Sequence, residues 1–227
     1  MSYIKNPFIY LVLFTGLNLL NAQSDFESLG ETSFAINTNV VNNYTINFAI
    51  NSRYYLYQDE AINFENRQLD FIHFSTFGLD YNHSLSLGLQ YRLRASIDGE
   101  SNELRLTQQF NNTQRHEAMR FGHRVRLEQR FFENLTILRS RYRFAIDFPL
   151  NGTKLDIGEA YLVNSMEALI SHSRKLKPEL GYRVTTQIGC LISEALKLQF
   201  GLEYRFEAFN LDTEQKLFLL TSAVLKI

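Results

Sequence analysis

The sequence predicts an all-β protein: a closed, antiparallel, up-and-down transmembrane β-barrel of ten to twelve strands. Three observations lead to this prediction. The chain begins with an apolar leader, continues with long segments in which apolar and polar residues alternate, and carries many arginines on the polar side of that alternation. Alternation with period two places successive side chains on opposite faces of a strand. In a membrane-spanning barrel the apolar face points outward.

The N-terminal segment, residues 1–22, predicts a signal peptide. One cation, Lys5, precedes an apolar stretch from Phe8 to Leu20, and the segment ends on a small residue, alanine. The apolar stretch is shorter than the roughly 17–25 residues of a spanning helix. We therefore expect export, cleavage after residue 22 and one mature barrel domain over residues 23–227. An N-terminal anchor helix is the alternative interpretation.

Eleven segments have the length and composition of strands, with turn-rich connections between them. Most keep their alternation for longer than the five to six residues of an average soluble strand, and a tilted membrane strand needs roughly 9–11. We expect long connections at 111–118 and 169–178, among others. The predicted strands are residues 27–36, 44–57, 69–81, 84–97, 103–112, 119–132, 135–148, 158–168, 179–191, 195–209 and 214–227.

Four segments, taken in chain order, show the alternation most clearly. In 44–57, tyrosine, isoleucine and phenylalanine alternate with threonine, asparagine and arginine. In 85–97, leucine and tyrosine alternate with serine, glutamine and arginine, and 136–148 opposes tyrosine and phenylalanine to a row of arginines. In 196–206, leucine and phenylalanine alternate with lysine, glutamine and glutamate. Each pattern predicts a strand with one apolar and one polar face.

The number of strands must allow the sheet to close into a barrel. In hydrocarbon every backbone N–H and C=O group needs a partner, so a spanning sheet has no free edge. Because single-chain bacterial barrels have an even number of strands, we expect ten or twelve rather than the eleven counted. Setting aside 27–36, as a partner strand or inner segment, leaves a ten-stranded barrel over 44–227 with both ends in the periplasm. A strand missed elsewhere would give twelve.

Arginine dominates the polar faces, with 16 arginines against seven lysines in the chain. The planar guanidinium suits a crowded, paired interior better than the lysine ammonium does. Cross-strand neighbours lie about 5 Å apart, so these side chains can form one lumen network. The predicted network comprises Arg92, Arg94, Arg105, Arg124, Arg126, Glu128, Arg130, Arg139, Arg141, Arg143, Arg183, Glu203 and Arg205.

Three roles are open for this network. A salt-bridged plug that fills a narrow lumen needs only arginine–carboxylate pairing. A basic constriction would select anions or phosphates. A cationic groove would bind a lipid head group or a partner protein.

The central part of the chain resembles a known family. The resemblance rests on Glu103–Phe110, His123–Phe131 and Leu138–Phe144, and above all on the His-Arg-x-Arg-x-Glu-x-Arg-Phe run within the second of these. These runs resemble the bacterial family called domain of unknown function 2490, whose members are regarded as exported outer-membrane barrel proteins. The resemblance covers about residues 26–227. It implies a location and a fold, and it brings no established activity or catalytic residues.

No catalytic, cofactor-binding or metal-ligating residues are predicted. Ser171 and His172 are adjacent, and neighbouring side chains on an extended chain point to opposite sides. No HExxH pattern or glycine-rich phosphate loop occurs. The single cysteine, Cys190, excludes an internal disulfide framework and a cysteine-rich zinc site. We expect a protein that is not an enzyme and needs no cofactor.

The predicted role is a structural or accessory one in the outer membrane of a Gram-negative bacterium, with a lumen filled largely by arginine and glutamate. A narrow, porin-like anion-selective pore or transporter is the alternative, and a lipid-modifying barrel enzyme is a third, weaker hypothesis. Expected partners are outer-membrane lipid, the barrel-assembly machinery during insertion, and a larger membrane complex. With 23 basic and 24 acidic residues, the chain lacks the basic excess of a nucleic-acid-binding protein.

Overall fold

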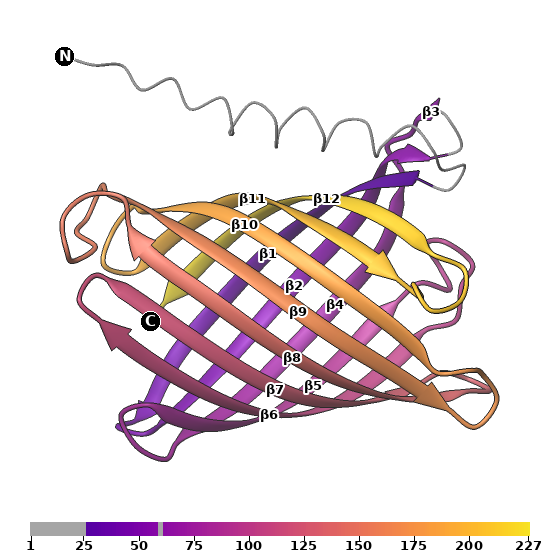
Figure 1. Ribbon diagram of the computed structural model, residues 1–227, viewed down its shortest axis with the longest axis horizontal. Helices are drawn as coiled ribbons and strands as arrows, with labels where there is room; N and C mark the ends of the chain where they lie inside the picture. The colour runs from indigo at the N-terminus through magenta and orange to yellow at the C-terminus, as the bar shows by residue number, and fades with distance from the viewer. Residues whose placement is uncertain (1–25, 59–60) are drawn as a thin grey trace.

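The computed structural model describes residues 26–58 and 61–227, and within these residues one sheet closes into a barrel (Figure 1). Eleven long strands form its wall, and the two-residue β3 pairs antiparallel with the last two residues of β2. The predicted signal peptide, residues 1–22, lies outside the described residues. The strands are β1 (Phe26–Val41), β2 (Tyr44–Gln58), β3 (Ala61–Ile62), β4 (Asn66–Gly78), β5 (His83–Leu93), β6 (Glu103–His116), β7 (Met119–Phe131), β8 (Thr136–Pro149), β9 (Ala160–Ser173), β10 (Glu179–Leu191), β11 (Leu196–Glu207) and β12 (Glu214–Lys226).

The barrel closes between β1 and β12, and these two strands run parallel. Their register extends from Phe26 opposite Gln215 to Asn37 opposite Lys226, while all other neighbouring strands pair antiparallel. The expectation of an even, wholly antiparallel barrel is therefore wrong, and the eleven strands counted in the sequence are all in the wall. A parallel ladder also pairs the edge N–H and C=O groups, so closure does not require an even number.

Parallel closure also separates the two ends of the chain. The first residue of β1 and the last residue of β12 lie at opposite ends of the barrel (Figure 1). The expectation that both ends of the barrel lie on one side is therefore wrong. It followed from setting aside residues 27–36, which the structure assigns to β1.

Two predicted connections are shorter than expected. β6 continues to His116 and meets β7 through a two-residue turn, in which Glu117 has a φ of 53°. The polar residues of 111–116 read as a loop in the sequence, but each pairs with a residue of β7. β9 continues to Ser173, well beyond the predicted end at residue 168. No helix long and apolar enough to cross a membrane occurs in the described part of the chain.

The two faces of the wall differ in chemistry. In β5, Leu85, Leu87 and Leu89 point outward and are 47–65% exposed, whereas Ser86 and Arg92 point inward and are at most 7% exposed. The predicted outward direction of the apolar rows is confirmed. The same outward position is taken by Phe34, Phe48, Ile50, Phe71, Phe77, Tyr91, Leu104, Leu106, Phe110, Val125, Leu127, Leu138, Tyr142, Met166, Ile170, Ile188, Leu198, Phe200, Leu202 and Leu219.

Candidate functional site

The barrel interior contains a cavity of about 380 Å³ towards the end at which β1 begins. Among the described residues, eleven arginines, one lysine and four acidic residues line it. Ten of the thirteen predicted network residues are in that lining: Arg92, Arg94, Arg105, Arg126, Arg130, Arg139, Arg141, Arg183, Glu203 and Arg205. The structure therefore brings together in space arginines that come from six different strands and one loop.

The other three predicted residues lie elsewhere in the interior. Glu128 is fully buried behind the cavity wall, and Arg124 approaches Glu167 at 3.4 Å. Arg143 lines a second interior cavity, of about 510 Å³, which also contains Arg120 and Asp147. The two cavities share no lining residue.

A series of alternating charges runs around the interior. Each adjacent pair in the series has a nitrogen–oxygen distance of 3.9 Å or less, and most pairs join neighbouring strands. The exceptions are Glu103 and Arg105, which are both on β6, and Glu27 of β1 with Arg67 of β4, which pair across β2. We call it the ion-pair ring, and its order is Asp70, Arg92, Glu103, Arg105, Glu128, Arg141, Glu167, Arg183, Glu207, Lys216, Glu27 and Arg67. Its first and last members, Asp70 and Arg67, both belong to β4, so the series returns to the strand on which it starts. Within the described residues these two side chains form no ion pair with each other, and the series has no closing contact there. It links every long strand except β2.

Strand β2 joins the charged interior through a separate pair. The Nε of Arg53 donates a hydrogen bond of 3.0 Å to Glu31 of β1. Glu31 also lies 4.0 Å from Arg205 of β11. All eleven wall strands therefore take part in interior ion pairs.

The most deeply buried links centre on two carboxylates. Glu103 has no exposed side-chain area and accepts hydrogen bonds from Arg130 at 2.7 and 2.8 Å and from Arg105 at 2.8 Å. Glu128 is equally buried and accepts a hydrogen bond of 2.9 Å from Arg141. Paired oxygens and guanidinium forks give strong, directional bonds. Within the described residues Arg130 has no other carboxylate partner than Glu103, and Arg126 has none other than Glu128. Removing either carboxylate would therefore leave a buried positive charge without a partner.

Aromatic rings hold some of these guanidiniums in place. The guanidinium of Arg205 lies 3.7 Å from the ring centroid of Phe218, and that of Arg126 lies 5.3 Å from the centroid of Phe74. The ring of Phe74 lies across Gly88 on the next strand, where a Cβ atom would stand only 2.3 Å from it. Glycine at 88 is therefore what allows the phenylalanine to lie flat against the wall.

Sequence reasoning found the arginines but missed most of their partners. Asp70, Glu103 and Glu167 were not predicted as site residues, although each occupies an inward position of its strand. The signal for Glu103 was present, because it shares its phase with Arg105. In β4 the polar face was harder to recognise. Asp70 shares the inner face with Ile72 and Phe74, so that face is not uniformly polar.

The remaining candidates do not form a catalytic group. Ser171 is buried and its hydroxyl accepts a hydrogen bond of 2.9 Å from Arg139, whereas His172 lies on the outer face. The two lie within β9, not in the predicted loop. Cys190 is a free thiol. Among residues 26–58 and 61–227, no cluster of three or more histidine, cysteine or acidic side chains could hold a metal ion.

Comparison with protein families gives one match. A family model described as "Protein of unknown function (DUF2490)" matches residues 32–215, which is most of the chain. The chain belongs to this family. The resemblance seen in the runs around Arg105, Arg126 and Arg141 is thereby confirmed, and all three runs lie inside the matched region. A comparison with curated proteins finds no match.

Proposed function

We propose that this DUF2490 protein is a β-barrel of the outer membrane of a Gram-negative bacterium, with a structural or accessory role and no enzymatic activity. The observation that supports this most is the outer wall. Leu87, Phe48 and Phe200 are 53–65% exposed, and similar side chains surround the barrel at alternate positions. Soluble monomers seldom expose apolar patches of more than a few hundred Å². Contact with lipid acyl chains would bury these rows.

The closed ladder and the ion-pair ring both suit this role. A closed sheet leaves no unpaired backbone edge in hydrocarbon, which a spanning protein requires. The ring ties the strands together from inside, because each of its carboxylates contacts cations from at least one neighbouring strand. We expect the barrel to reach the membrane through the leader at residues 1–22 and the barrel-assembly machinery, and to act beside other membrane proteins.

Membrane fractionation tests this proposal. The protein should sediment with outer membranes and remain there after a carbonate wash. It should also migrate faster on a denaturing gel when unheated, because a folded barrel binds less detergent. Release as a soluble protein by osmotic shock would contradict the proposal.

A second candidate function is a narrow anion-selective pore. It is favoured by the twelve basic and four acidic residues that, in the described part of the chain, line the 380 Å³ cavity. Rings of arginine and lysine are a recurrent way of selecting anions. Purified barrel in a planar bilayer should then pass a current that prefers chloride to potassium. Arg126→Ala and Arg141→Ala should reduce that preference, whereas Arg120→Ala, outside the 380 Å³ cavity, should not. Absence of anion-selective current would exclude this candidate.

A further inference from the structure

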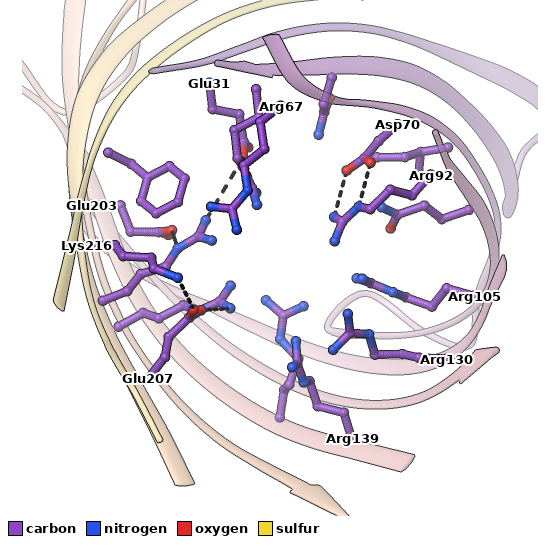
Figure 2. Close-up of a pocket in the computed structure, with 18 of the residues that line it drawn as sticks. Glu31, Arg67, Asp70, Arg92, Arg105, Arg130, Arg139, Glu203, Glu207 and Lys216 are labelled. Carbon is purple, nitrogen blue, oxygen red and sulfur yellow. Dashed lines mark hydrogen bonds and ion pairs between the residues drawn. The ribbon is translucent and has the colours of Figure 1, made fainter. Parts of the chain in front are cut away.

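One wall of the 380 Å³ cavity consists almost entirely of guanidinium groups. Figure 2 shows Arg105, Arg130 and Arg139 extending from this side into the open space. We call this surface the arginine wall, and it comprises Arg92, Arg105, Arg126, Arg130, Arg139 and Arg141, from four adjacent strands.

The arginine wall carries more positive than negative charge. Within the ranges that the structure describes, its six guanidiniums share four carboxylates at 4.0 Å or less: Asp70, Glu103, Glu128 and Glu167. Six positive charges against four negative ones leave an excess of two. Glu167 is further divided, since it also contacts Arg124 and Arg183. The excess is therefore at least two.

Three of these four carboxylates lie behind the guanidiniums rather than among them, and Asp70 lines the cavity. Glu103, Glu128 and Glu167 have side chains no more than 7% exposed, and none of the three lines the cavity. They hold the guanidiniums from the wall side, so the remaining N–H groups of the forks point towards the open space. The arginine wall therefore presents donors and positive charge to the cavity. The carboxylates that line the cavity are Asp70, beside Arg92, and, from other strands, Glu31, Glu203 and Glu207.

Two groups at the cavity have spare donors. Arg139 contacts no carboxylate at 4.0 Å or less within residues 26–58 and 61–227, and its Nε donates to the Ser171 hydroxyl. The Nε of Arg183 is buried and has no hydrogen-bond acceptor among those residues. A buried guanidinium N–H without an acceptor costs free energy, which an anion from solution would recover.

We infer that this cavity is a binding site for a small soluble phosphomonoester. A phosphate of this kind carries about −1.5 to −2 charge at pH 7 and three acceptor oxygens, which matches an excess of two positive charges. Guanidinium forks bind phosphate oxygens in pairs. The cavity volume of about 380 Å³ falls within the usual range for small-molecule sites. Leu220 also lines it and would contact the organic part of the ligand.

This inference deepens the proposed function by giving the barrel interior a ligand, and it requires only that the barrel is folded. It depends neither on conduction nor on outer-membrane location. Loss of membrane sedimentation would therefore contradict the proposed function alone, and loss of phosphate binding by a folded barrel would contradict this inference alone.

Isothermal titration of the full mature chain, folded in detergent micelles, tests the inference. Glycerol 3-phosphate should bind saturably with one site, inorganic phosphate should compete with it, and glycerol should not bind. Affinity should fall as salt is raised, because the contacts are between charges. Phosphatidic acid in mixed micelles tests whether the cavity instead binds the phosphate head group of a lipid. Binding of phosphatidic acid alone, or of neither phosphate ester, would overturn the inference.

Substitutions at single arginines test where in the barrel the phosphate binds. Arg139→Gln should weaken glycerol 3-phosphate binding about tenfold or more, in line with loss of one charge-assisted hydrogen bond. Arg126→Gln provides a second test if the first variant folds poorly, and the heat-dependent gel shift reports folding for both. Arg120→Gln is the matched control, because it removes an interior arginine outside the cavity and should leave binding unchanged. Equal binding by the Arg139, Arg126 and Arg120 variants would overturn the placement.

Discussion

The outer and inner faces of the same strands face two different surroundings. On β5, Leu87 is 65% exposed on the outside, while its neighbour Ser86 is 4% exposed on the inside. On β11, Phe200 is 53% exposed outward and Arg205 is 6% exposed inward. The apolar side chains are those most in contact with the surroundings, and the charged ones are those most enclosed. This is the reverse of a soluble protein, and it separates the effects of mutations on the two faces.

The largest effect is expected at a carboxylate of the inner face. Glu103→Ala removes the shared partner of Arg92, Arg105 and Arg130 and leaves buried positive charge unpaired. Breaking a buried pair in this way costs about 3–5 kcal/mol. Urea unfolding of the barrel in lipid vesicles measures it. A loss below about 1 kcal/mol would mean that water reaches and solvates this part of the interior.

The next effect contrasts two adjacent residues on opposite faces. Leu89→Arg places a charge on the outer face, which near the centre of a bilayer costs about 2–4 kcal/mol. Gln90→Arg adds the same side chain beside the cavity, where it has space, and should be much milder. Equal losses of unfolding free energy for the two variants would contradict the assignment of faces.

A smaller effect tests packing on the inner face. Gly88→Ala puts a methyl group where the ring of Phe74 now lies, and overpacking of this kind costs about 1–3 kcal/mol. Gly122→Ala is the matched control, because its Cβ would meet only the Cβ of Ala145, at 4.0 Å. The control should unfold at the same urea concentration as the natural chain or a higher one. Destabilisation by Gly122→Ala equal to that by Gly88→Ala would contradict the packing argument.

The smallest effect is expected at an exposed ion pair. Arg120 donates to Asp147 at 2.8 Å, but its side chain is 58% exposed. Exposed pairs contribute about 0–1 kcal/mol. Arg120→Ala should therefore change the unfolding free energy by less than any variant above. A loss of unfolding free energy as large as that of Glu103→Ala would show that the contribution of an ion pair does not depend on its burial.

The individual strands could be predicted from the local alternation of residues, whereas the pairing between strands distant in the chain could not. Strand β5 was predictable because leucine and polar residues alternate without interruption. The pairing of β1 with β12 was not, since Phe34 and Ala223 lie far apart in the chain and no local signal marks a parallel partner. General experience of even strand numbers led to the wrong count, although the pattern of 27–36 was that of a strand.

The candidate site, too, could be predicted only in part from the sequence. The arginines were predictable because they recur at every second position, as at Arg139 and Arg141. Their partners were not, because Asp70 and Glu167 are single acids on faces that also hold apolar or small side chains. Which member of the arginine wall lacks a carboxylate partner depends on the register of four strands, and in the described part of the chain the folded barrel identifies Arg139.

The most direct test of the account is the environment of Leu89 and Gln90. In a chain with Cys190 replaced by alanine, single cysteines at 89 and 90 carry a nitroxide spin label in lipid vesicles. Collision with oxygen, which dissolves in acyl chains, should be frequent for the label at 89 and rare at 90. A water-soluble nickel chelate should collide least with the label at 89. The reverse order, with the label at 89 reached by the chelate and not by oxygen, would contradict the claim that the apolar rows contact lipid.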